Sequence, residues 1–163
     1  MLKKLLLATV CAASLSAAFE VFAIDKAIKA VSGEIGCYGN HNEDSVSSTI
    51  FRNFDPKKSI SITKITVYKS DGSLMQELSP AGFPSGFNEI MVPFSANTLS
   101  TSTLFPGQNP GRLTFRINFK STDGSPALAP YINSALYYYT SSSKTSLSTS
   151  STFECIYTSL SSK

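Results

Sequence analysis

The residues that come closest to a catalytic or metal-binding group are His41-Asn42-Glu43-Asp44, where an imidazole stands beside two carboxylates. His41 is the single histidine of the chain, so a small secreted hydrolase would have to use it as its general base. A zinc or iron site needs further ligands at defined spacings, and no second histidine supplies one. We therefore interpret 41–44 as a solvated polar turn, with no metal and no cofactor. The hydrolase remains the alternative function.

Other segments that resemble reactive motifs lack the context that their chemistry requires. Ser85 does not stand at the serine position of a G-x-S-x-G nucleophile elbow. The segment 106–111 contains two glycines but neither the lysine nor the helix of a phosphate-binding loop. Asp55, Asp71 and Asp123 occur singly beside or near Pro or Gly, which is typical of turns and not of a paired acid and base. We predict that the protein is not an enzyme and has no catalytic residue.

Three consecutive tyrosines, Tyr137-Tyr138-Tyr139, are the feature that suggests recognition. Successive side chains of a strand point to opposite faces, so at least one ring should reach the surface. Exposed tyrosines stack on sugars or anchor a protein partner, and Tyr137 and Tyr139 are our candidate ligand contacts. The competing interpretation is that these tyrosines only stabilise a strand.

Residues 1–23 have the layout of a secretory signal peptide. Two lysines near the start precede a largely apolar run over 5–13, and small residues follow. We expect cleavage after Ala23, although a cut after Ala18 fits the same pattern. The mature protein is then secreted or periplasmic and comprises one domain, residues 24–163.

Membrane attachment is not expected. A lipidated cysteine normally follows a small residue, whereas Val10 precedes Cys11. The apolar run is also shorter than the ~20 residues that a spanning helix needs. After cleavage, no membrane span is predicted.

The charge of the chain argues against a nucleic-acid partner. The formal net charge is +3 for all 163 residues, and removal of the signal peptide lowers it to about +2. Lysine and arginine are not clustered into the basic stripe that follows a phosphate backbone.

Export leaves two cysteines, Cys37 near the start of the domain and Cys155 near its end. A pair of cysteines in an oxidising compartment predicts a disulfide, which would bring the first and last strands together. The alternative makes Cys37 a nucleophile with His41 as its base, but a thiol with one available partner usually oxidises there.

Strand periodicity dominates the mature chain. Apolar residues alternate with polar ones from Leu113 to Phe119, which predicts a half-buried strand. The isoleucine-rich segment 59–69 changes phase near Thr63-Lys64, which predicts either a β-bulge there or burial on both faces. Asp71-Gly72 then predicts a tight hairpin to a strand over 74–78. Further strands are predicted over 46–53, 90–94, 132–139 and 152–158, and the Ser/Thr-rich run 140–151 is predicted as a loop.

Seven or so short strands without helical periodicity predict an all-β fold, an antiparallel immunoglobulin-like β-sandwich. The segment Arg52-Asn53-Phe54-Asp55-Pro56, its isoleucine-rich strand and the Asp71-Gly72 turn resemble a bacterial secreted domain family of unknown function. The resemblance implies a sandwich in the bacterial envelope or medium, and it transfers no active site.

Together these observations predict an exported, non-enzymatic binding or interaction module. Its partner would be an envelope protein or a glycan, bound through loops, a sheet face or an edge strand that accepts another chain. The sequence makes no prediction of the oligomeric state.

Overall fold

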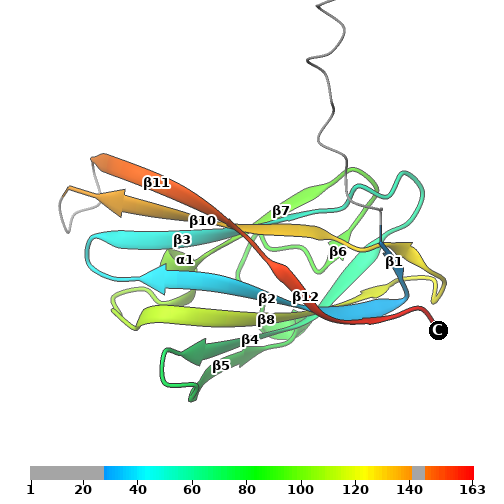
Figure 1. Cartoon of the computed structure of the whole chain (residues 1–163), viewed down its shortest axis with the longest axis horizontal. Helices are drawn as coiled ribbons and strands as arrows, with labels where there is room; N and C mark the ends of the chain where they lie inside the picture. The colour runs from blue at the N-terminus through cyan, green and yellow to red at the C-terminus, as the bar shows by residue number, and fades with distance from the viewer. Residues whose placement is uncertain (1–27, 141–145) are drawn as a thin grey trace, which may run out of the picture.

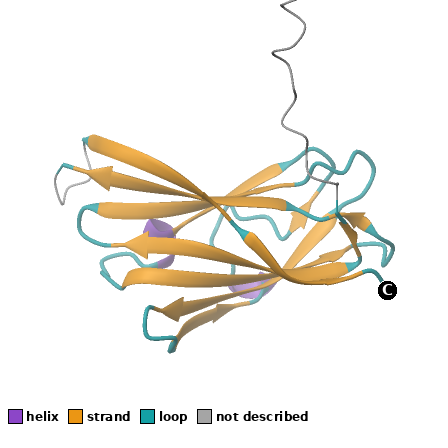
Figure 2. Cartoon of the chain, viewed as in Figure 1, coloured by secondary structure: helices purple, strands orange, loops and turns teal. Residues whose placement is uncertain are grey.

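The computed structural model describes residues 28–140 and 146–163. The predicted signal peptide over 1–23, with Cys11, lies outside the described residues. The described chain is dominated by antiparallel strands (Figure 2), as the all-β prediction requires. Among these residues, no helix combines the length and the apolar character needed to cross a membrane.

The described residues form twelve strands and two single-turn helices. In chain order the strands are β1 (Lys29–Ala30), β2 (Ser32–His41), β3 (Ser45–Arg52), β4 (Ile60–Lys69), β5 (Leu74–Leu78), β6 (Ile90–Met91), β7 (Ala96–Ser100), β8 (Gly111–Ser121), β9 (Ala127–Leu128), β10 (Tyr131–Tyr139), β11 (Leu147–Glu154) and β12 (Ile156–Ser161). The helices are the 3-10 turn η1 (Pro80–Gly82) and α1 (Thr101–Leu104).

The strands pack as a sandwich whose two layers meet along one side (Figure 1). One layer has the order β11-β10-β3-β7, and the other has the order β12-β2-β8-β4-β5, with β6 also paired to β4. A single bridge between His41 and Val46 connects β2 to β3 and so joins the layers. The immunoglobulin-like arrangement of these strands stays a prediction.

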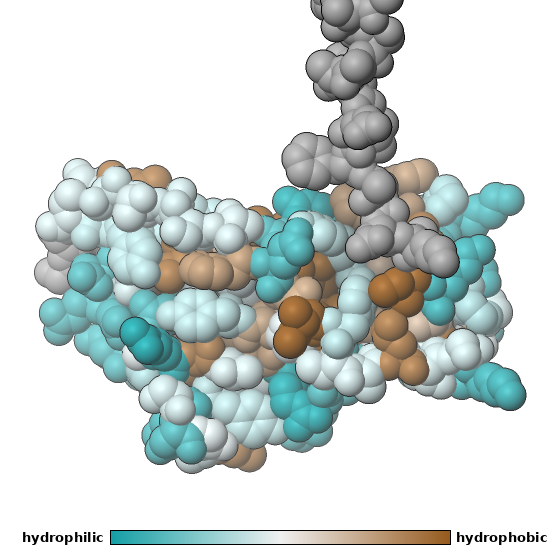
Figure 3. Space-filling model, viewed as in Figure 1, coloured by the Kyte–Doolittle hydropathy of each residue, from teal (hydrophilic) through white to brown (hydrophobic). Residues whose placement is uncertain are grey.

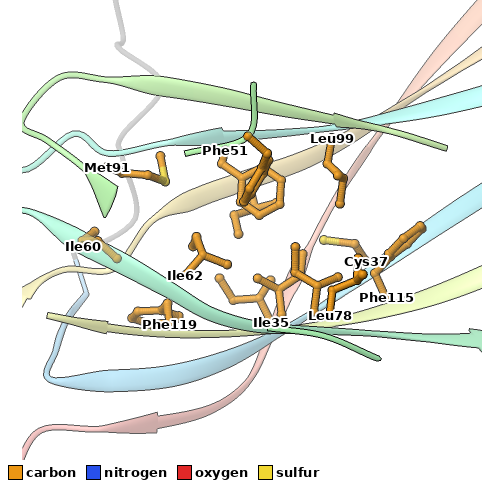
Figure 4. Packing of buried hydrophobic residues seen from close by; sticks show 14 of the residues in the cluster. Ile35, Cys37, Phe51, Ile60, Ile62, Leu78, Met91, Leu99, Phe115 and Phe119 are labelled. Atoms are coloured by element: carbon orange, nitrogen blue, oxygen red, sulfur yellow. The ribbon is translucent and has the colours of Figure 1, made fainter. Parts of the chain in front are cut away.

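The hydrophobic core fills the space between the layers (Figure 4). Phe51 and Leu99 reach it from one layer, and Ile35, Ile62 and Phe119 from the other. The alternation predicted for β8 is confirmed, because its four apolar side chains are all buried, Leu113, Phe115, Ile117 and Phe119. The predicted bulge is confirmed too, since the pairing of β4 with β8 shifts register between Ile62 and Lys64.

The C-terminal part of the sequence prediction was wrong in two respects. The Ser/Thr-rich run 140–151 is not all loop, because β11 begins at Leu147 and pairs with β10; residues 141–145 lie outside the described part. The segment 152–158 is not one strand, because β11 ends at Glu154 and β12 pairs instead with β2 in the other layer. Alternating polarity predicts extended backbone but not a change of layer.

The predicted disulfide is confirmed between Cys37 and Cys155, with the two Cα atoms 4.6 Å apart. Cys155 stands where the chain passes from one layer to the other. Its N–H donates to the Ile132 carbonyl on β10 at 3.2 Å, while the next residue, Ile156, pairs with Gly36 on β2. The bridge to Cys37 on β2 therefore fixes the point at which the last strand crosses between the layers.

Candidate functional site

His41 does not lie on an exposed turn, contrary to the sequence interpretation. It is the last residue of β2 and only 3% exposed, and its ring lies against Phe105 with the ring centroids 6.4 Å apart. Glu43 and Asp44 occupy the turn that follows and point to solvent. The imidazole is buried and the two carboxylates face solvent, so the three groups that suggested a metal site do not come together. Nowhere in the described chain do three or more His, Cys, Asp or Glu residues gather as a metal site would require.

His41 belongs to a buried polar cluster that we call the strand fork, made of Asn40, His41, Ser45, Ser47 and Thr101. Along one edge of β3 the paired strand changes here: Val46 pairs with β2, whereas Ser48 pairs with β7. Ser47 lies between these two residues, so its backbone pairs with neither β2 nor β7. Its N–H donates to the Thr101 hydroxyl at 3.0 Å, and that hydroxyl lies 3.1 Å from the carbonyl oxygens of Asn40 and Ser47.

The remaining polar groups of the strand fork are also paired with one another. Asn40 donates its N–H to the Ser47 hydroxyl at 3.0 Å and its side-chain amide to the Ser45 hydroxyl at 2.6 Å. His41 Nδ1 lies 3.3 Å from the Thr101 hydroxyl. Buried polar groups are costly unless they are hydrogen-bonded, so this arrangement is what a strand junction needs. The Thr101 hydroxyl is committed to backbone groups, and we assign the cluster to structure.

The candidate contacts Tyr137 and Tyr139 lie on β10, between β3 and β11. Both are half-buried, and Tyr138 between them is the more exposed ring. Tyr137 faces Val46 on one neighbouring strand and Ser150 on the other, so no charged residue is paired with it. The structure does not test ligand contact by these residues, which stays a prediction.

The segment Arg52-Asn53-Phe54-Asp55 divides its side chains between the interior and the surface. Asn53 is fully buried, and its amide donates to the carbonyl oxygens of Lys58 at 2.8 Å and Met91 at 2.9 Å. Asp55 is also buried, and its carboxylate accepts three backbone N–H groups, from Lys57, Lys58 and Leu128. These two residues hold loops in place, which agrees with the structural reading of the motif.

The hydrogen bonds to Asp55 also set its ionisation. Burial by itself raises the pKa of Asp55, but the three backbone donors and the nearby Lys58 charge outweigh it, so the pKa lies below its ordinary value. The carboxylate therefore stays charged while it holds these loops together.

The other two side chains, Arg52 and Phe54, point outward and meet Tyr131 at the start of β10. The Phe54 and Tyr131 rings are 52% and 41% exposed, with centroids 6.1 Å apart and planes inclined by 44°. The guanidinium carbon of Arg52 lies 5.9 Å from the Tyr131 centroid, and its Nη1 donates to Asn133 Oδ1 at 2.6 Å. These contacts hold the Arg52 side chain beside two exposed rings.

Phe94 is exposed on a turn where glycine would be expected. The Ser95 N–H donates to the Val92 carbonyl at 3.1 Å, and the turn Val92-Pro93-Phe94-Ser95 has proline second and a positive φ of 56° at Phe94. That is the type II pattern, whose third position favours glycine. Phe94 is the one non-glycine residue with positive φ in the described chain, and it is 71% exposed. Left-handed backbone costs a non-glycine residue about 1–2 kcal/mol, and a ring this exposed recovers little of it.

The strand register places the turn that carries Phe94 next to the end of β3. Arg52 pairs with Ala96, and the Asn53 N–H donates to the Ser95 carbonyl at 2.9 Å. Phe94 is the neighbour of Ser95 in this turn, as Phe54 is the neighbour of Asn53 in the chain that leaves β3. We call Arg52, Phe54, Phe94 and Tyr131 the aromatic patch. It lies where β3 ends and β7 and β10 begin (Figure 1).

Arg52 has no acidic partner within the described ranges, in contrast to Arg116 on β8. Arg116 forms an ion pair with Glu34 at 2.6 Å. The hydrogen bond from Arg116 lowers the pKa of Glu34, which also accepts from Thr158. Hydrophobic side chains also gather over β12, beside this group (Figure 3). The charges of Arg116 and Glu34 are therefore paired with each other, whereas Arg52 in the aromatic patch is a cation that a ligand can pair with.

The sequence reasoning missed the aromatic patch because its members come from three separate segments. One local signal was available, since Asn53 and Asp55 alternate with Arg52 and Phe54, which suggests opposite faces. The contribution of Tyr131 could not be found that way. Tyr131 and Arg52 are far apart in the sequence, and their contact depends on β10 pairing with β3.

No family model, no curated protein and no solved structure matches this chain.

Proposed function

We propose that this protein is an exported, non-enzymatic glycan-binding module and that the aromatic patch is its binding site. The observation that carries the proposal is Phe94, an exposed aromatic ring on a strained backbone at a position that favours glycine. Strain that folding does not require is a common mark of a functional residue. The predicted signal peptide and the disulfide support placement in the bacterial envelope or medium.

The chemistry of the patch suits a sugar. Aromatic rings offer flat apolar surfaces to the C–H groups of a pyranose, while a polar group beside them fixes its orientation. The rings of Phe54 and Tyr131 form two inclined surfaces, and Phe94 adds an exposed ring on the adjacent turn. The Arg52 guanidinium retains N–H donors beyond the one bonded to Asn133, and these suit sugar hydroxyls or the carboxylate of an acidic sugar.

The size of the patch favours a glycan over an envelope protein. A stable protein interface buries about 800 Å² on each partner and contains some 20 or more residues on each side. Three rings and one arginine correspond instead to a few sugar units. This replaces the broader sequence expectation, envelope protein or glycan, with a single ligand class.

Binding to soluble polysaccharides tests the proposal. The mature protein is titrated by calorimetry with a neutral polysaccharide and with a polyuronate, alongside Phe54→Ala, Tyr131→Ala and Arg52→Gln. We expect the two ring substitutions to weaken binding at least tenfold, because each removes a stacking surface. Arg52→Gln should weaken the polyuronate more than the neutral polymer.

The matched control is the pair Tyr137→Ala and Tyr139→Ala, which removes tyrosine rings from the same strand outside the patch. Thermal unfolding of every variant verifies that the fold is intact. Equal loss of binding in the control variants would place the site on the tyrosine run instead. Absence of binding to both polymers by the wild-type protein would refute the proposal.

A further inference from the structure

The outer edge of β11 is a further feature to which no role has yet been assigned. All eight residues of this strand are exposed, and within the described ranges β11 pairs with β10 alone. A free edge presents unpaired backbone N–H and C=O groups to solvent, which makes it a template for another strand.

The register identifies the backbone groups that face outward. The Cys155 N–H donates to β10 at Ile132, and along an antiparallel strand alternate residues bond to the same neighbour. Residues 149, 151 and 153 therefore direct their backbone groups to β10. Ser150, Thr152 and Glu154 direct theirs away from it, to the open edge.

The other edge strands of the described chain carry features that normally prevent strand addition, whereas β11 has such a feature only near its first residue. β5 and β7 have five residues each, and Glu77 on β5 forms an ion pair with Lys64 at 2.7 Å. β12 shifts register between Tyr157 and Ser159, in the middle of its pairing with β2. β11 shifts register with β10 between Leu147 and Thr149, but it keeps one register from Thr149 to Glu154. Its residues 147–153 include no charge and no proline, and its one charged residue is Glu154 at the end.

We propose that β11 pairs antiparallel with β11 of a second copy of this chain and forms a two-fold symmetric dimer. Self-pairing is compatible with the sequence Leu147-Ser-Thr-Ser-Ser-Thr-Phe153, because small hydroxyl side chains meet small hydroxyl side chains and no like charges oppose each other within it. Each copy has one such edge, so an isologous pair uses both edges and closes without further growth.

The dimer would extend one layer of each sandwich into a continuous sheet through both copies. Its contacts are mainly backbone hydrogen bonds, so the association depends on the edge geometry and not on the aromatic patch. The inference is therefore independent of the proposed function.

Sedimentation velocity of the mature protein between about 10 µM and about 1 mM tests the proposal. We expect the sedimentation coefficient to rise from monomer to dimer across this range. Thr152→Pro removes an outward N–H without removing a bond to β10, and Ser150→Lys places a charge at the edge twice, once from each copy. Both variants should weaken dimerisation at least tenfold.

The matched control is Thr98→Lys, which adds the same charge to an exposed position on the β7 edge. It should dimerise like the wild type. Unchanged melting temperatures distinguish loss of pairing from loss of fold. A wild-type protein that stays monomeric throughout, or a dimer that Thr152→Pro and Ser150→Lys leave intact, would overturn the proposal.

Discussion

The strand fork and the aromatic patch lie at opposite ends of β3, and they use polar residues in opposite ways. At the Ser45 end, the polar side chains are buried and paired with one another or with backbone, and they include the one histidine of the chain. At the Arg52 end, three aromatic rings are exposed near a half-buried cation, and one of the rings stands on strained backbone. Residue type alone would rank the fork as the functional end.

Our criterion for the proposed site is therefore a feature that folding leaves unexplained. Every polar group that makes the fork look reactive has a partner required by the junction of three strands. The exposure of Phe94 and its positive φ have no such role in the fold. The two regions should therefore respond differently to substitution, and four experiments test that difference in addition to the binding and dimerisation measurements proposed above.

The largest effect on stability is expected at the fork. Thr101→Val keeps the shape of the side chain but leaves the Ser47 N–H and a buried carbonyl without their partner. An unsatisfied buried group costs about 1–3 kcal/mol, so the free energy of unfolding should fall by about 3 kcal/mol. Urea denaturation measures this change. Glycan binding should be unaffected below the unfolding transition, and a stability loss under about 0.5 kcal/mol would remove the structural role assigned to the hydroxyl.

A smaller effect is expected for Asp55→Asn, which tests whether the inward residues next to the patch are structural. The amide offers one acceptor oxygen where the carboxylate offers two, and the free energy of unfolding at pH 7 should fall by about 2 kcal/mol. Exposed Glu43→Gln serves as the control and should change little.

The pH dependence of the same variant sharpens the test. Because the pKa of Asp55 is lowered on folding, its ionised form stabilises the protein above the ordinary value of 3.8, and this contribution is lost as the pH falls further. The stability difference between wild type and Asp55→Asn should therefore shrink below that pH. A difference that stayed constant down to pH ~2 would contradict the assignment.

The smallest effect on stability has the opposite sign and concerns Phe94. Phe94→Gly should relieve the left-handed strain and raise the free energy of unfolding by about 0.5–1 kcal/mol, while glycan binding weakens. Phe94→Ala keeps the strain and loses the ring, so it should weaken binding without the gain in stability. If Phe94→Gly binds as tightly as the wild type, the ring does not belong to the site.

Much of the fold could be predicted because local pattern and local physics agree. The alternation in β8, the phase change in β4 and the Asp71-Gly72 turn each reflect a constraint that acts within a few residues. The patch and the fork could not be predicted, because Arg52 meets Tyr131, and Ser47 meets Thr101, only after distant strands have paired.

By itself, the sequence determined that this chain is built of strands and that Cys37 and Cys155 are joined, since periodicity and cysteine count need no knowledge of neighbours. Only the tertiary structure decided that His41 is buried, that the chain changes layer at Cys155 and that Arg52, Phe54 and Tyr131 meet. The physical reason is that burial and proximity depend on which strands become neighbours, and pairing over long separations is set by the packing of the whole core.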